Sequence, residues 1–146
     1  MNPLGGYDIE DLQPGMSASF GKTVTEADIL LFAGVSGDIN AIHLNEEFAA
    51  TTIFGGRVAH GMLTAGFISA VLGNKLPGPG TVYMAQNIRF RLPVRIEQTV
   101  TATVTVREIF PDKCRVILDT VCTVLGKVVA DGEATVMVTS SKNVKV

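Results

Sequence analysis

The sequence lacks an excess of basic residues, a targeting segment and any long apolar run. Its formal net charge is -2, so nothing in the charge balance favours a nucleic acid or an anionic membrane as partner. The first seven residues have neither the positive nor the apolar region of a signal peptide. The apolar stretch at 62–72 is interrupted by Thr64, Gly66 and Ser69, and it falls short of the roughly 18 apolar residues that a membrane span needs. We therefore expect a cytoplasmic protein with no nucleic-acid or membrane partner.

Cysteine is also scarce, since the chain has only Cys114 and Cys122. The alternating pattern around them predicts that both lie on one strand, where their Cα atoms would be roughly 26 Å apart at about 3.3 Å per residue. A disulfide requires a separation below about 7 Å. Neither cysteine has a histidine or a second cysteine at metal-ligand spacing. We predict two free thiols and no metal site.

The second half of the chain, from about residue 99 to residue 139, alternates with a period of two, which is typical of strands with one buried face. The rows that would face a core are Val100, Ala102, Val104 and Val106; Val116, Leu118, Thr120, Cys122 and Val124; and Ala130, Ala134, Val136 and Val138. Turn-forming pairs at 111–112 and 125–126 separate these rows. An earlier strand is expected at 82–94. The pattern predicts antiparallel strands joined by short turns.

The first half of the chain favours helices. Thr25 can cap a helix that runs to about Gly34, and a short helix is expected after Asn45. A third helix, at about 61–75, is apolar almost all round, so it must be enclosed. We predict an α+β fold in which an antiparallel sheet wraps around this long buried helix, as a single domain over residues 1–146.

The first concentration of polar chemistry lies in the predicted loop at 36–43. It brings the carboxylate of Asp38, the amide of Asn40 and the imidazole of His43 within six residues. Gly37 and Asn40 suit a tight turn, so Asp38 and His43 can come together. The alternative is that Asp38 and Asn40 only shape the loop and that His43 only satisfies a backbone carbonyl.

The second concentration lies at 54–62, where a loop with paired glycines leads into the long helix. The unpaired N–H groups of the first helical turn can stabilise developing negative charge, and Gly61 would let a ligand approach the backbone closely. The alternative is that Gly61 only relieves crowding between helix and sheet, and that His60 is a surface histidine.

Together these segments resemble the MaoC-like hydratases of the hot-dog fold, especially the stand-alone (R)-specific enoyl-CoA hydratases. The matching motifs are Asp38-x-Asn40-x-x-His43, then Ala59-His60-Gly61-Met62 about seventeen residues later, and Arg89-Phe90-x-x-Pro93-Val94. The resemblance extends over nearly the whole chain. One departure is Ala41, where many members have proline; it removes no functional group.

The resemblance implies (R)-specific hydration of trans-2-enoyl-CoA, a lyase reaction of fatty acid metabolism. Asp38 and His43 would activate one water molecule as the catalytic pair, and the Gly61 N–H would bind the thioester oxygen. Asn40 would order the loop. His60 would have a structural role, so it is not counted among the catalytic residues.

The resemblance also implies that the acyl chain lies beside the long helix, where Ser69 and Leu72 are candidate substrate-binding residues. The resemblance implies that a CoA thioester is the substrate, and no further cofactor is expected. Hot-dog relatives form homodimers, and the strand at 82–94 could continue the sheet into a second copy of the chain. Arg57, Arg89 and Arg91 could meet CoA phosphates, but a solvated surface charge is the better explanation for each of them, so none is assigned to a site.

Other functions are also compatible with a hot-dog fold. Hot-dog thioesterases and dehydratases that carry their acid on the long helix need a carboxylate there, and 61–75 contains no Asp or Glu. A MaoC-type (R)-3-hydroxyacyl dehydratase acting on acyl carrier protein would use the same chemistry, so this alternative stays open. A non-catalytic acyl-CoA-binding protein is disfavoured because both Asp38 and His43 are present.

Overall fold

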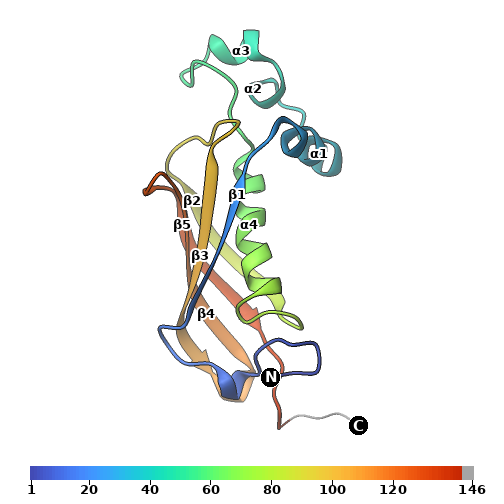
Figure 1. Cartoon of the computed structure of the whole chain (residues 1–146), viewed down its shortest axis with the longest axis vertical. Coiled ribbons are helices and arrows are strands. Elements are labelled where there is room, and N and C mark those ends of the chain that lie inside the picture. The colour runs from blue at the N-terminus through green and yellow to red at the C-terminus, as the bar shows by residue number, and fades with distance from the viewer. Residues whose placement is uncertain (143–146) are drawn as a thin grey trace.

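A curved antiparallel sheet packs along one face of a long helix in the computed structural model, which describes residues 1–142 (Figure 1). The strands are β1 (Ser17–Thr23), β2 (Val82–Phe90), β3 (Thr99–Phe110), β4 (Arg115–Val124) and β5 (Lys127–Met137). Their order in the sheet is β1-β3-β4-β5-β2, and every neighbouring pair is antiparallel. This confirms the predicted α+β hot-dog architecture.

The helices fall into two groups. The long helix α4 (Gly61–Asn74) lies against the sheet, whereas α1 (Glu26–Ser36), α2 (Ala41–Leu44) and α3 (Glu46–Ala50) gather beyond one end of it, away from the two termini (Figure 1). Two short 3-10 helices, Ile9–Asp11 and Pro111–Lys113, complete the elements. In the part of the chain that is described, no helix combines the length and the apolarity required to cross a membrane.

The core forms where the alternating strand residues meet α4. The predicted inward rows of β3, β4 and β5 are buried, and so are four apolar residues of α4: Phe67, Ile68, Val71 and Leu72. The other face of α4 stays uncovered in the single chain, since Met62 is 60% exposed and Gly66 and Ser69 are also exposed. The expectation that this helix is enclosed therefore holds only on its sheet side.

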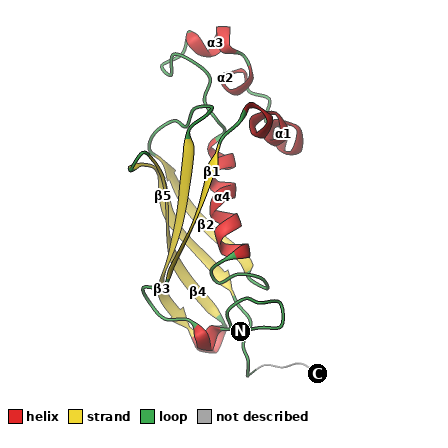
Figure 2. Ribbon diagram, viewed as in Figure 1, coloured by secondary structure: helices red, strands yellow, loops and turns green. Residues whose placement is uncertain are grey.

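Three local predictions need correction. The strand predicted at 82–94 ends at Phe90, because the next two amides, of Arg91 and Leu92, both turn to the carbonyl of Val129 and Pro93 has no N–H to donate. Cys114 lies just before β4 in a left-handed conformation, not on the strand. The loop predicted at 36–43 is also shorter, since its last three residues belong to the short helix α2 (Figure 2).

Cys114 and Cys122 are both free in the described structure. Burial raises the pKa of Cys122 to about 11, so this thiol stays protonated and unreactive at neutral pH.

Candidate active site

The Asp38 carboxylate is held at the start of a two-step turn that leads from α1 to α2. α1 ends at Gly37, whose φ of 79° is left-handed and favours glycine. The Asp38 carboxylate then accepts a hydrogen bond from the amide of Asn40 at 3.2 Å, and the Asn40 side chain accepts one from the amide of Ile42 at 3.2 Å. Asn40 thereby caps α2. The turn reverses the chain and brings His43 back towards Asp38.

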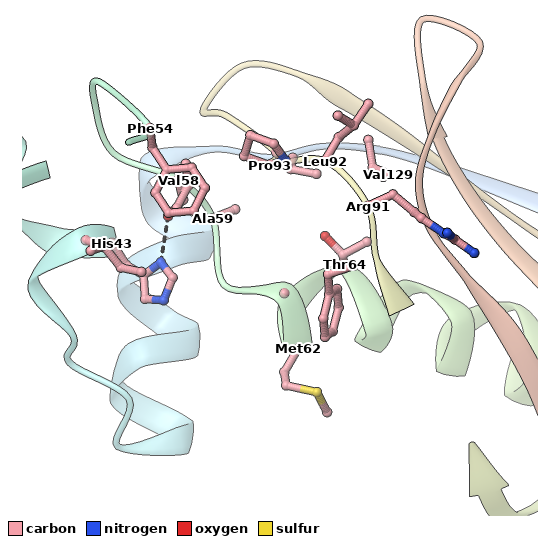
Figure 3. A pocket seen from close by; sticks show the side chains of 14 residues that line it. His43, Phe54, Val58, Ala59, Met62, Thr64, Arg91, Leu92, Pro93 and Val129 are labelled. Carbon is pink, nitrogen blue, oxygen red and sulfur yellow. Dashed lines mark hydrogen bonds between the residues drawn. The ribbon is translucent and has the colours of Figure 1, made fainter. Parts of the chain in front are cut away.

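His43 lies on α2 and is only 7% exposed. Its Nδ1 lies 2.7 Å from the carbonyl oxygen of Val58 (Figure 3), and because a carbonyl only accepts, Nδ1 carries the proton. Nε2 is therefore left to face Asp38, at 4.0 Å from the nearer carboxylate oxygen. This distance is too long for a direct hydrogen bond, but both groups can bind one water molecule.

His60 connects the two polar segments. It is 1% exposed, its Nε2 donates to the carbonyl of Asp38 at 2.9 Å, and its ring stacks on that of His43 with centroids 3.9 Å apart. The interpretation of His60 as a surface histidine is therefore wrong. Ligand atoms of Asp38, His43 and His60 lie within 4.8 Å of one another. The two rings are only 29° from parallel, however, so their in-plane lone pairs do not converge on one metal ion.

The N-terminus of α4 contributes backbone donors to the same place. The helix begins at Gly61. The Leu63 amide bonds to the carbonyl of the cap residue His60 at 3.1 Å, which leaves the amides of Gly61 and Met62 as the free donors of the first turn. A Cβ on Gly61 would lie 2.9 Å from the ring of Phe90. Glycine is thus required for the close contact with Phe90, as the crowding interpretation supposed, and Gly61 also lines a pocket.

This pocket has a volume of about 360 Å³ and a mostly apolar wall (Figure 3). Its lining residues are Ile42, His43, Phe54, Val58, Ala59, Gly61, Met62, Thr64, Phe90, Arg91, Leu92, Pro93, Val94 and Val129. Of the predicted site residues, His43 and Gly61 line it directly. Ser69 is exposed and Leu72 is 1% exposed in the core, and neither lines this pocket in the single chain.

Arg57 was not assigned to the site from the sequence, although it holds the site together. Its Nε donates to the carbonyl of His43 at 2.6 Å, and its two terminal nitrogens donate to the two carboxylate oxygens of Glu26 at 2.8 and 2.9 Å. These bonds lower the pKa of the Glu26 carboxyl. Arg57 therefore ties α1 and the end of α2 to the loop that enters α4. Arg91, which the sequence also offered as a contact for CoA phosphates, forms an ion pair with Asp131 at 3.1 Å.

Residues 11–138 match the model of the MaoC like domain. The chain belongs to the MaoC-like family. Its MaoC-like sequence is 60% identical to the (R)-specific enoyl-CoA hydratase of Rhodospirillum rubrum, over 88% of this chain and 90% of that protein. It is 50% identical to the 3-hydroxybutyryl-CoA dehydratase of Methylorubrum extorquens, over 88% of this chain and 82% of that one.

Solved structures agree with this MaoC-like assignment. The unliganded R-hydratase PhaJ1 of Pseudomonas aeruginosa superposes with a TM-score of 0.87 at 41% identity, covering 93% of this chain and 88% of that one. The predicted resemblance to MaoC-like hot-dog hydratases is confirmed.

Proposed function

We propose that this protein is an (R)-specific hydro-lyase that adds water to trans-2-enoyl-CoA and gives (R)-3-hydroxyacyl-CoA. The observation that carries the proposal is the separation of 4.0 Å between the Asp38 carboxylate and Nε2 of His43, beside the pocket that Gly61 also lines. The relatives of highest identity described above, which carry hydratase and dehydratase names, support the same reaction.

The proposed reaction begins with one water molecule held between Asp38 and Nε2 of His43. As the water oxygen bonds to C3 of the enoyl group, one of its protons passes to this pair. The C2–C3 π electrons move towards the thioester, whose oxygen becomes enolate-like. Return of a proton from the pair to C2 completes the addition. Since the same groups deliver hydroxyl and proton, both add to one face of the double bond.

Two features of the site would lower the barrier. A positioned acid/base pair contributes about 10²–10⁴-fold in rate, and the Nδ1 bond of His43 to Val58 keeps Nε2 free for this role. The Gly61 N–H and the positive end of the α4 dipole would stabilise the enolate oxygen. Loss of one such donor commonly costs about 10²–10³-fold in rate.

The rest of the assignment follows from the same proposal. No cofactor is required beyond the CoA thioester, and the active unit is a homodimer in which the uncovered face of α4 is buried. Ser69 lies on that face, so its proposed contact with the acyl chain, like that of Leu72, belongs to the assembled protein. The cytoplasmic location expected from the sequence stays a prediction.

A coupled assay tests the proposed reaction. The purified protein should remove the enoyl absorbance of crotonyl-CoA, and an added (S)-specific 3-hydroxyacyl-CoA dehydrogenase should then form no NADH. An unchanged enoyl signal would contradict hydration, and rapid NADH formation would contradict the (R) product. Parallel assays with crotonyl thioesters of CoA and of acyl carrier protein identify the carrier, and faster turnover of the second would favour the alternative dehydratase assignment.

A further inference from the structure

Thr64 presents an unused hydroxyl to the pocket. It lies on α4, three residues after Gly61, lines the same cavity and is only 2% exposed. Figure 3 shows its side chain at the pocket wall, with the oxygen directed towards the side where Leu92 and Pro93 lie. Most of the surrounding lining residues are apolar.

The Thr64 hydroxyl differs from comparable hydroxyls in this chain. In α1 the Ser36 hydroxyl bonds back to the carbonyl of Phe32 at 2.6 Å, and the other buried threonine, Thr120, accepts a hydrogen bond from Gln86 at 2.9 Å. The Thr64 hydroxyl takes part in no hydrogen bond among residues 1–142, yet it is not one of their fully buried, unpaired side-chain atoms, of which His60 Nδ1 is the only one. Its oxygen therefore opens onto the pocket, where it can bond to a ligand.

Helix geometry places this hydroxyl near the proposed oxyanion donor. Residues three apart share one face of a helix, and side chains lean towards the helix N-terminus. The Thr64 side chain therefore lies over the turn that begins with Gly61. The other polar side chains of the pocket have partners already, since His43 Nδ1 is bonded to Val58 and Arg91 is paired with Asp131.

We propose that the Thr64 hydroxyl donates a hydrogen bond to the thioester oxygen of the substrate, beside the N–H of Gly61. This inference rests on the proposed function, because it assigns a second donor to the same thioester. An enolate oxygen can accept two hydrogen bonds, and a donor aimed at it stabilises the transition state more than the ground state. Thr64 is then a substrate-contacting residue that acts chiefly on kcat.

Paired substitutions test the proposal. Thr64→Val should lower kcat for crotonyl-CoA by about 10²–10³-fold with little change in KM, as loss of one oxyanion donor does, while Thr64→Ser keeps most of the rate. The Tm of Thr64→Val should equal or exceed that of the wild type. The matched control is Thr120→Val, which removes a bonded hydroxyl that does not line the pocket and should lower Tm but not kcat.

A binding measurement separates this proposal from the proposed function. Acetoacetyl-CoA is not hydrated, but oxyanion donors stabilise its enolate, which absorbs in the near ultraviolet. The enolate signal of the bound thioester should fall in Thr64→Val and persist in Thr64→Ser, even if crotonyl-CoA proved not to be a substrate. Wild-type kcat and enolate signal in Thr64→Val would overturn the proposal. So would a Thr64→Val protein that fails to fold, because the hydroxyl would then have an internal role.

Discussion

At the scale of single residues, the amide of Gly61 and the ring of Phe90 constrain each other. A Cβ on residue 61 would lie 2.9–3.0 Å from three atoms of that ring, so either the ring or the start of α4 must move if a side chain is added. Gly61→Ala keeps the N–H but displaces it. We expect kcat to fall by at least about 10-fold, since a donor of this kind is commonly worth about 10²–10³-fold.

The double variant Gly61→Ala/Phe90→Ala serves as the control for the clash. Removing the ring opens the space that the new methyl group needs, so part of the lost kcat should return. Full activity in Gly61→Ala alone, measured with crotonyl-CoA, would show that the position of this amide is unimportant.

The reactive groups could be identified from the sequence because their chemistry is unusual for their surroundings: a carboxylate and an imidazole near a turn-forming glycine, and a glycine at a helix start. The burial of His60 could not be identified in this way. Its contacts with His43 and with the carbonyl of Asp38 join segments 17 and 22 residues away, and no local pattern encodes such a stack. The same holds for the bond from Arg57 to the carbonyl of His43.

At the scale of elements, Arg57 joins α1 and the end of α2 to the loop that enters α4. Arg57→Gln should release the carbonyl of His43, so that His43 Nε2 is held less firmly beside Asp38. We expect kcat to fall by at least about 10-fold, which is less than the full rate contribution of a positioned acid/base group. Added guanidinium ion should restore part of the rate in Arg57→Ala. If the rate were lost because the protein had unfolded, guanidinium ion would restore nothing. The control is Arg107→Gln, which breaks a similar bridge to Asp119 and Glu133 on the sheet and should leave kcat unchanged.

The same bridge predicts how stability depends on pH. Arg57 lowers the pKa of Glu26, so the stabilisation is complete above the ordinary glutamate range and is lost as pH falls through the lowered pKa. The Glu26 side chain is 49% exposed, and solvent weakens such a pair, so the effect should be small. Urea unfolding below about pH 5 should show a smaller acid-induced loss in Glu26→Gln than in the wild type. Equal losses would contradict a role for this pair in folding.

Strong periodicity explains which elements could be predicted. The alternating rows of β3, β4 and β5 specify both the type of element and its buried face, whereas α4 is apolar almost all round and its pattern specifies a helix but not which face is buried. The Thr25 cap specifies the start of α1, where its side chain accepts from Asp28 at 3.2 Å. α2 has only four residues, too few to show a helical period. The end of β2 depends on hydrogen bonds to Val129, which lies far along the chain.

At the scale of the whole molecule, the two edges of the sheet differ in character. Edge strand β1 pairs its hydroxyls with those of β3, for example Ser19 with Thr103 at 2.9 Å, whereas edge strand β2 exposes Val82 and Met84, each at 48%. An apolar edge favours pairing with another strand. We expect sedimentation at micromolar concentration to give about twice the 15.5 kDa mass of one chain. A 15.5 kDa species alone would contradict the dimer.

The claim on which the whole account depends is that Asp38 and His43 act as one unit, and a double-mutant cycle tests it most directly. Asp38→Asn should fold normally because its side chain is 49% exposed, and the amide of His43→Gln can still donate to the carbonyl of Val58. Each variant should lose at least about 10² in kcat. The double variant should be scarcely slower than the worse single one, because groups that act together lose activity non-additively. Normal turnover in a folded Asp38→Asn protein, judged by an unchanged Tm, would contradict the mechanism.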